Sequence, residues 1–147
     1  MARLVSAIIT TSNRFEFFKK ALISIKNQTY KDIEIIVVDG GDGKQVESYI
    51  KKYSDIIYIT SDNNHPNVLR NLGIRSANGN WVSFLDDDDT WVPEKIELQI
   101  KCFLTNKFAL TKQFFPILMF CLITDPLPMK VLFFIITPPF TVDLVAR

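Results

Sequence analysis

The segment 81–95, WVSFLDDDDTWVPEK, holds the residues with the clearest chemical potential, because an apolar strand runs directly into four consecutive aspartates. In an extended segment side chains alternate between faces, so Asp86 and Asp88 would point to one side while Asp87 and Asp89 point to the other. Two carboxylates on one side of a strand end offer hard oxygen ligands, and Mg²⁺ or Mn²⁺ would relieve their mutual repulsion. A metal ion bound there could hold a diphosphate.

The same acidic run has a simpler interpretation. It could be a solvated loop whose last residues cap the helix that begins near Pro93. The preceding apolar residues favour the metal site, because Trp81, Phe84 and Leu85 would place the carboxylates at the rim of a core.

The first hundred residues alternate between two patterns. Short apolar or β-branched runs predict strands at 4–10, 33–38, 56–59 and 81–85. Apolar residues at helical spacing follow each run and predict helices over 15–25, 46–53 and 68–77 and from Pro93 onward. Asn78-Gly79 would close the helix over 68–77. Alternation of this kind predicts an α/β fold with a mainly parallel sheet covered by helices on both faces.

This architecture predicts where a ligand binds. Parallel strands share one carboxyl edge, and ligands of open α/β sheets bind in the crevice outside it. Thr10, Asp39 and the run 86–89 follow three different strands, so we expect them to converge there. The chain has neither GxGxxG after the first strand nor GxxxxGK[ST], which excludes the dinucleotide fingerprint and the P-loop. Phosphates would therefore be held by a metal ion.

Composition narrows the class of protein. With 147 residues, of which 48% are hydrophobic and 22% charged, the chain suits a domain with a real core. A net charge of +1 without a dense Lys/Arg stripe argues against a nucleic-acid partner. Cys102 and Cys121 lack CxxC spacing, and with no signal peptide before the first strand they predict a reducing, cytoplasmic setting.

Five blocks of sequence, in this order and spacing, resemble the family 2 glycosyltransferases of the GT-A fold. They are IITTSNR at 8–14, NQTY at 27–30, IIVVDGG at 35–41, RNLGI at 70–74 and FLDDDDTWVPEK at 84–95. The resemblance covers roughly residues 4 to 100 and implies a Rossmann-like, mostly parallel sheet flanked by helices. It also implies metal-assisted transfer of a sugar, with inversion, from a UDP- or GDP-linked donor to a glycan or lipid-linked acceptor.

The resemblance implies roles for residues outside the acidic run. Thr10 would contact the nucleotide from the end of the first strand, and Asp39 would hydrogen-bond the base. Arg70 would lie near the nucleotide, although it could also be an ordinary exposed helix residue. The chain departs from the family pattern at Gly40, where a second Asp is frequent, and at Asp42, where Ser is common.

Within the acidic run, Asp86 and Asp88 match the family's DxD motif. Asp88 would be the direct ligand of Mn²⁺ or Mg²⁺, and Asp86 would lie nearer the ribose or a water bound to the metal. Asp87 would support the nucleotide-sugar site.

From Phe103 onward the composition changes, with frequent Phe and Pro and with Asp125 and Asp143 as the acidic residues. We therefore divide the chain into a nucleotide-sugar-binding domain at 1–102 and a hydrophobic tail at 103–147 without a recognisable acceptor domain. The apolar runs 114–123 and 131–136 are too short to span a bilayer. We interpret the tail as the product of a frameshift or a truncated gene, with shallow contact at the inner face of the membrane as the alternative.

The general base that inversion requires has no match in this chain, because neither Asp125 nor Asp143 has a supporting context. Two other functions therefore stay open. The chain could be a non-catalytic nucleotide-binding fragment, or a metal-dependent phosphoryl-transfer enzyme that uses the same carboxylates.

Overall fold

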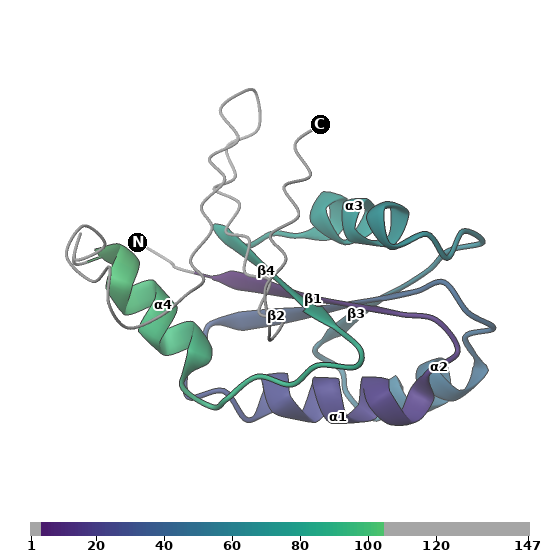
Figure 1. Ribbon diagram of the computed structural model, residues 1–147, viewed down its shortest axis with the longest axis horizontal. Coiled ribbons are helices and arrows are strands. Elements are labelled where there is room, and N and C mark those ends of the chain that lie inside the picture. The colour runs from purple at the N-terminus through teal and green to yellow at the C-terminus, as the bar shows by residue number, and fades with distance from the viewer. Residues whose placement is uncertain (1–3, 105–147) are drawn as a thin grey trace.

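The computed structural model describes residues 4–104, with side chains through residue 101. Its strands and helices alternate in the order β1 (Val5–Thr11), α1 (Phe15–Lys26), β2 (Ile33–Asp39), α2 (Lys44–Ile50), β3 (Ile56–Thr60), α3 (Pro66–Ser76), β4 (Trp81–Asp86) and α4 (Lys95–Leu104). The strands form one parallel sheet in the order β3-β2-β1-β4 (Figure 1). The predicted α/β fold with a parallel sheet is confirmed.

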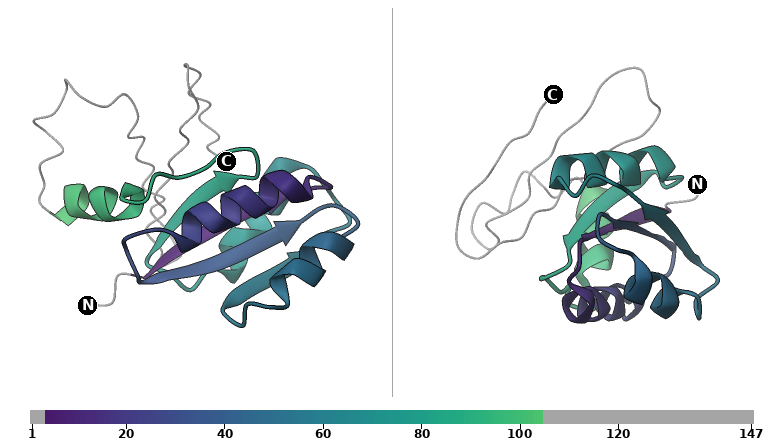
Figure 2. Two further views of the ribbon diagram at one scale, coloured as in Figure 1. Left: turned by 90° about the horizontal axis from the view of Figure 1, so that it is seen from below. Right: turned by 90° about the vertical axis from the view of Figure 1, so that its right-hand side faces the viewer.

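Helices cover both faces of this sheet, with α3 on one face and α1 and α2 on the other (Figure 2). Strand alternation divides the buried residues accordingly. Ala7 and Ile9 of β1 pack in a core cluster with residues of α1, α2 and α4. Ile8 faces the opposite side and packs in a smaller cluster with Leu69 of α3. Gly73 lets α3 lie close to the sheet, because an added Cβ would meet Ile8 Cγ2 at 2.5 Å.

Several predicted helix boundaries were wrong, and the helix expected from Pro93 begins at Lys95. The helix expected over 46–53 ends at Ile50, so Tyr53 lies beyond it, although its ring still packs edge-on against Tyr49 at 6.0 Å. The helix expected from residue 68 begins at Pro66, because proline suits the first helical position and His65 caps the helix by accepting the N–H of Asn67.

The reason for Gly79 also differs from the prediction. It does not close α3 in a left-handed conformation; Gly43 is the glycine with positive φ in the described part of the chain. An added Cβ at Gly79 would instead lie 2.5 Å from Ser6 Oγ and 2.8 Å from the carbonyl oxygen of Leu4. A glycine is therefore required there by the close approach of the α3–β4 loop to β1.

Among the helices within residues 4–104, none combines the length and the hydrophobicity that a membrane span needs. The boundary predicted at residue 102 falls within α4. The predictions for residues 105–147, including those for Asp125 and Asp143, lie outside the described residues.

Candidate functional site

The carboxyl ends of β1, β2 and β4 meet at one edge of the sheet, as predicted. The strand register pairs Thr10 with Asp86 and Thr11 with Asp39. Thr10 Oγ1 donates a hydrogen bond to Asp86 Oδ1 at 3.4 Å. The structure therefore brings Thr10, Asp39 and the start of the acidic run together at the carboxyl edge.

The acidic run turns rather than continuing as a strand. β4 ends at Asp86, and the N–H of Asp89 donates to the carbonyl oxygen of Asp86 at 3.1 Å, which closes a turn. The predicted alternation of faces through Asp89 was therefore wrong, because a turn breaks the strand period of two. The Asp86 and Asp88 side chains are 39% and 48% exposed, whereas that of Asp87 is 5% exposed.

Arg70 of α3 reaches this edge and binds Asp86. Its Nη2 donates to Oδ1 at 2.8 Å and to Oδ2 at 3.1 Å. The Arg70 side chain is 27% exposed, so both partners keep access to solvent. Arg70 is therefore placed at the carboxyl edge by its contact with Asp86, and its role toward a ligand stays a prediction.

Arg14, just before α1, is the main counter-charge of the turn. Its Nη1 lies 3.1 Å from Asp87 Oδ1, and its Nη2 donates to Asp88 Oδ2 at 2.8 Å. Thr11 Oγ1 donates to the other Asp87 oxygen at 2.8 Å. Burial raises the pKa of Asp87, while the bond from Thr11 and the charge of Arg14 oppose this rise.

Arg14 was not predicted to be a site residue. From the sequence alone it would only shape the start of the first helix. A signal was present, since four adjacent aspartates require cations and Arg14 follows the neighbouring strand. The hydrogen bond that Arg14 donates to Asp88, and then the charge of Asp87, raise the pKa of Arg14, so it remains a cation.

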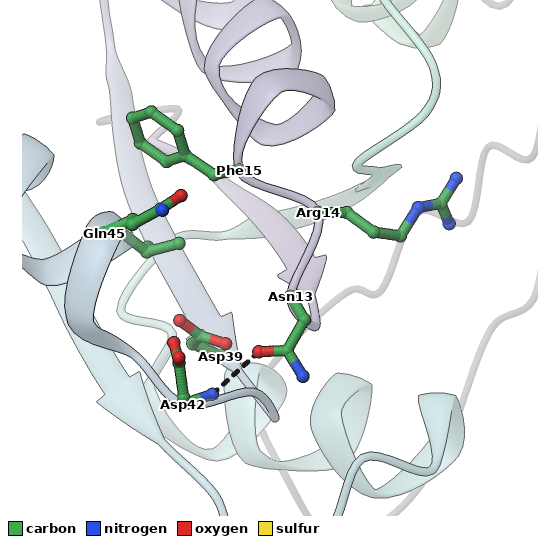
Figure 3. A pocket seen from close by; sticks show the side chains of 7 residues that line it. Asn13, Arg14, Phe15, Asp39, Asp42 and Gln45 are labelled. Atoms are coloured by element: carbon green, nitrogen blue, oxygen red, sulfur yellow. Dashed lines mark hydrogen bonds between the residues drawn. The ribbon is translucent and has the colours of Figure 1, made fainter.

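A cleft of about 300 Å³ opens beside this edge, between the ends of β1 and β2 and the start of α2 (Figure 3). Its lining residues are Asn13, Arg14, Phe15, Asp39, Asp42, Gln45 and Val46. In Figure 3 the Arg14 side chain points away from Asp39. Asp39 is 1% exposed, and its Oδ1 accepts the N–H of Gly41 at 2.7 Å while its Oδ2 accepts the hydroxyl of Tyr58 at 3.1 Å.

Asn13 connects the two loops that border the cleft. It has a left-handed backbone, with φ of 54°, and its Oδ1 accepts the N–H of Asp42 at 2.9 Å. An added Cβ at Gly41 would meet Asn13 Oδ1 at 2.5 Å. Gly41 therefore permits the contact that fixes the loop after β2.

Asp86 and Asp88 have the donor chemistry that a divalent cation requires. Among the described residues, no group of three or more His, Cys, Asp or Glu side chains is placed to hold a metal ion. Proteins commonly bind Mg²⁺ through one or two carboxylates, while substrate phosphates and water complete its coordination. By donor type, Asp86 and Asp88 thus fit a divalent metal ion that takes its other ligands from outside the protein.

The chain is similar to known proteins of one family. The family model described as glycosyl transferase family 2 matches residues 6–117. An uncharacterized glycosyltransferase of Rickettsia felis is 39% identical over 107 residues, which are 71% of this chain and 18% of that relative. The chain thus spans less than a fifth of that relative's length.

Solved structures show the same fold. S. aureus TarS 1-349 in complex with UDP-GlcNAc matches 80% of this chain and 38% of its own, with a TM-score of 0.60 and 22% identity. The mannosyltransferase PcManGT from Pyrobaculum calidifontis, in complex with GDP-Man and Mn²⁺, matches 59% of this chain and 28% of its own, with a TM-score of 0.54 and 25% identity. The predicted GT-A fold is confirmed, and this chain belongs to glycosyl transferase family 2.

Proposed function

We propose that the carboxyl edge of the sheet binds a UDP- or GDP-linked sugar, and that the chain serves transfer of this sugar to a glycan or lipid-linked acceptor. The observation that carries the proposal is the cleft at Asp39, which lies beside the carboxylates of Asp86 and Asp88. Both carboxylates are partly exposed and paired with arginines, and the chain is a member of family 2. The structural neighbours add support, because TarS is seen with UDP-GlcNAc and PcManGT with GDP-Man and Mn²⁺.

In this proposal the nucleoside occupies the cleft. Asp39 accepts a hydrogen bond from an N–H of the base, while Phe15 and Val46 supply apolar surface. Thr10 and Asp86 lie next to each other at the strand ends, where they would contact the ribose or the first phosphate. Family resemblance motivates these roles, and the cleft beside Asp39 supports them.

The diphosphate would lie over the acidic turn. Arg14 and Arg70 bring two guanidinium groups to this edge, and guanidinium groups suit phosphate oxygens. Asp88 and Asp86 would hold Mn²⁺ or Mg²⁺, which when bound neutralises charge on the departing nucleoside diphosphate. Asp87 would support the diphosphate site indirectly, because its ion pair with Arg14 holds the guanidinium group in place.

Transfer with inversion also requires a base within hydrogen-bond reach of the acceptor hydroxyl. None of the described residues at this edge is assigned that role. Catalysis by this chain is therefore a separate part of the proposal from donor binding, and the two need separate measurements.

Donor binding is tested by titrating UDP, GDP, UDP-GlcNAc and GDP-Man with and without Mn²⁺. We expect Asp88→Ala to abolish the gain in affinity that Mn²⁺ gives to the wild type. Asp32→Ala is the matched control, because Asp32 is an exposed aspartate immediately before β2, at the opposite edge of the sheet. Mn²⁺-dependent binding that survives Asp88→Ala unchanged would contradict the metal assignment.

The products identify the reaction. Sugar appearing on an acceptor supports glycosyl transfer. Inorganic phosphate released from a nucleotide whose sugar stays attached supports phosphoryl transfer, and donor binding without turnover supports a non-catalytic nucleotide-binding chain.

A further inference from the structure

The hydroxyl of Tyr58 donates a hydrogen bond to the carboxylate of Asp39, a residue that lines the cleft. Tyr58 lies in the middle of β3, and the register pairs it with Val37 of β2. Asp39 is two residues beyond Val37 and therefore shares its face of the strand. Tyr58 Oη lies 3.1 Å from Asp39 Oδ2 and 3.4 Å from the carbonyl oxygen of Gly43.

The hydroxyl of Tyr58 donates its hydrogen bond to Asp39 rather than to Gly43. The carboxylate is the nearer of the two acceptors, and its charge makes the hydrogen bond stronger than one to a neutral carbonyl. Burial, and then the charge of Asp39, raise the pKa of Tyr58, so the hydroxyl stays protonated and remains a donor.

Gly43 provides the room that this arrangement needs. It is the N-cap of α2 and has a left-handed backbone, with φ of 72°. An added Cβ there would lie 3.0 Å from Tyr58 Oη, closer than most such contacts allow. The loop after β2 therefore folds around the hydroxyl without displacing it.

Two donors thus fix the orientation of Asp39. The N–H of Gly41 holds Oδ1 and Tyr58 holds Oδ2. A carboxylate has roughly four acceptor positions, so about two remain for a ligand in the cleft that Asp39 lines. Because rotation of the carboxylate would break both bonds, the direction of its remaining acceptor positions is set by the protein.

We propose that Tyr58 is a positioning residue for base selection, which holds the Asp39 carboxylate so that the cleft prefers a base with a ring N–H over one with a ring nitrogen lone pair. Uracil and guanine carry such an N–H, whereas cytosine and adenine place a lone pair at the corresponding ring position. A fixed carboxylate attracts the first kind and repels the second. The inference rests on the proposed function and adds the residue that enforces the choice of base.

The test compares Tyr58→Phe with the wild type, using the full chain with Mn²⁺ and measuring Kd for UDP, GDP, CDP and ADP by calorimetry. We expect the tighter of UDP and GDP to bind about tenfold more weakly to the variant. CDP and ADP should change by less than about twofold, because they do not use the Asp39 carboxylate as acceptor. The preference between bases should therefore fall by about tenfold.

Tyr53→Phe is the control, because it removes a tyrosine hydroxyl from the turn after α2 and should leave all four constants unchanged. A second pair of variants shows whether Tyr58 acts through Asp39. In an Asp39→Asn background, Tyr58→Phe should have no further effect on the preference, since the carboxylate that it positions is gone.

The outcomes separate the two proposals. A wild type that binds none of the four nucleotides defeats the proposed function. A wild type that prefers UDP or GDP, with a Tyr58→Phe variant that keeps this preference or weakens all four equally, overturns the inference and leaves the function standing. A wild type that binds all four equally also overturns the inference.

Discussion

The amino edge and the carboxyl edge of the sheet both hold carboxylates, but different kinds of donor bind the carboxylates at each edge. At the amino edge, Glu34 accepts from Ser6 Oγ, from the N–H and the side-chain amide of Asn78 at 2.6 and 3.2 Å, and from the N–H of Gly79 at 2.9 Å. At the carboxyl edge, Asp86 and Asp88 instead rely on arginine side chains at 2.8 Å.

This difference separates a structural carboxylate from one available to ligands. Backbone N–H groups are fixed by the fold, so the acceptors of Glu34 are occupied permanently. Arginine side chains can rotate away, and ion pairs between partly exposed groups contribute little to stability. Substitutions at the amino edge should therefore change stability, and substitutions at the carboxyl edge should change binding.

The largest effect is expected away from both edges, at Lys95. Its Nζ donates to Ser83 Oγ at 3.0 Å, and burial lowers its pKa to about 7. Between about pH 7 and 10 the unfolded chain binds more protons at this lysine, so stability should rise with pH by on the order of 3 kcal/mol. Lys95→Met should remove this rise in urea unfolding; equal pH slopes for variant and wild type would contradict it.

At the amino edge, Glu34→Ala should lower the free energy of unfolding by about 2 kcal/mol, because it leaves the donors of a charged acceptor without their partner. Nucleotide affinity of the folded variant should stay unchanged. Glu16→Ala is a control, since its exposed ion pair with Lys19 should matter by less than about 0.5 kcal/mol. A loss of nucleotide affinity equal to that of Asp88→Ala would remove the distinction between the edges.

Glu34 also predicts a response to acid. Burial raises its pKa, but the hydrogen bonds from Ser6, Asn78 and Gly79 outweigh this and leave the pKa lowered. The stabilisation should therefore be complete above the ordinary value of about 4.3 and be lost as pH falls through the lowered pKa. Unfolding of the wild type and Glu34→Gln should converge in acid; a constant difference would refute this coupling.

At the carboxyl edge, Thr11→Val keeps the side-chain shape but removes the hydrogen bond to buried Asp87. We expect a loss of about 1 kcal/mol in stability, together with a few-fold weaker nucleotide binding as Arg14 loses its fixed partner. Urea unfolding and the UDP and GDP titrations measure both quantities. A change in stability alone would assign Thr11 and Asp87 to the core rather than to the site.

The smallest effect is expected at Asp55, which pairs with Lys26 at 3.0 Å on the surface. Asp55→Ala should change stability by less than about 0.5 kcal/mol, because exposed ion pairs gain little. Thermal unfolding in low and high salt measures the change. A larger loss would mean that surface pairs in this chain cannot be treated as weak, and it would weaken the comparison of the two edges.

The strands and the convergence of Thr10 with Asp86 could be predicted from the sequence, because apolar runs and parallel topology follow general rules. The turn after Asp86 could not, since a run of identical residues carries no signal of where a strand ends. Arg14 and Tyr58 were missed because their partners, Asp87 and Asp39, lie on other elements of the chain. Such contacts depend on strand register, which composition and spacing do not specify.

Hydrogen exchange on the wild type, with and without Mn²⁺ plus the tighter of UDP and GDP, tests most directly whether the carboxyl edge is the binding edge. We predict slower exchange in the segments 12–14, 40–46 and 87–90, with no change at 33–34 and 77–80 of the amino edge. Protection confined to the amino edge, or unchanged exchange throughout at saturating nucleotide, would contradict this assignment.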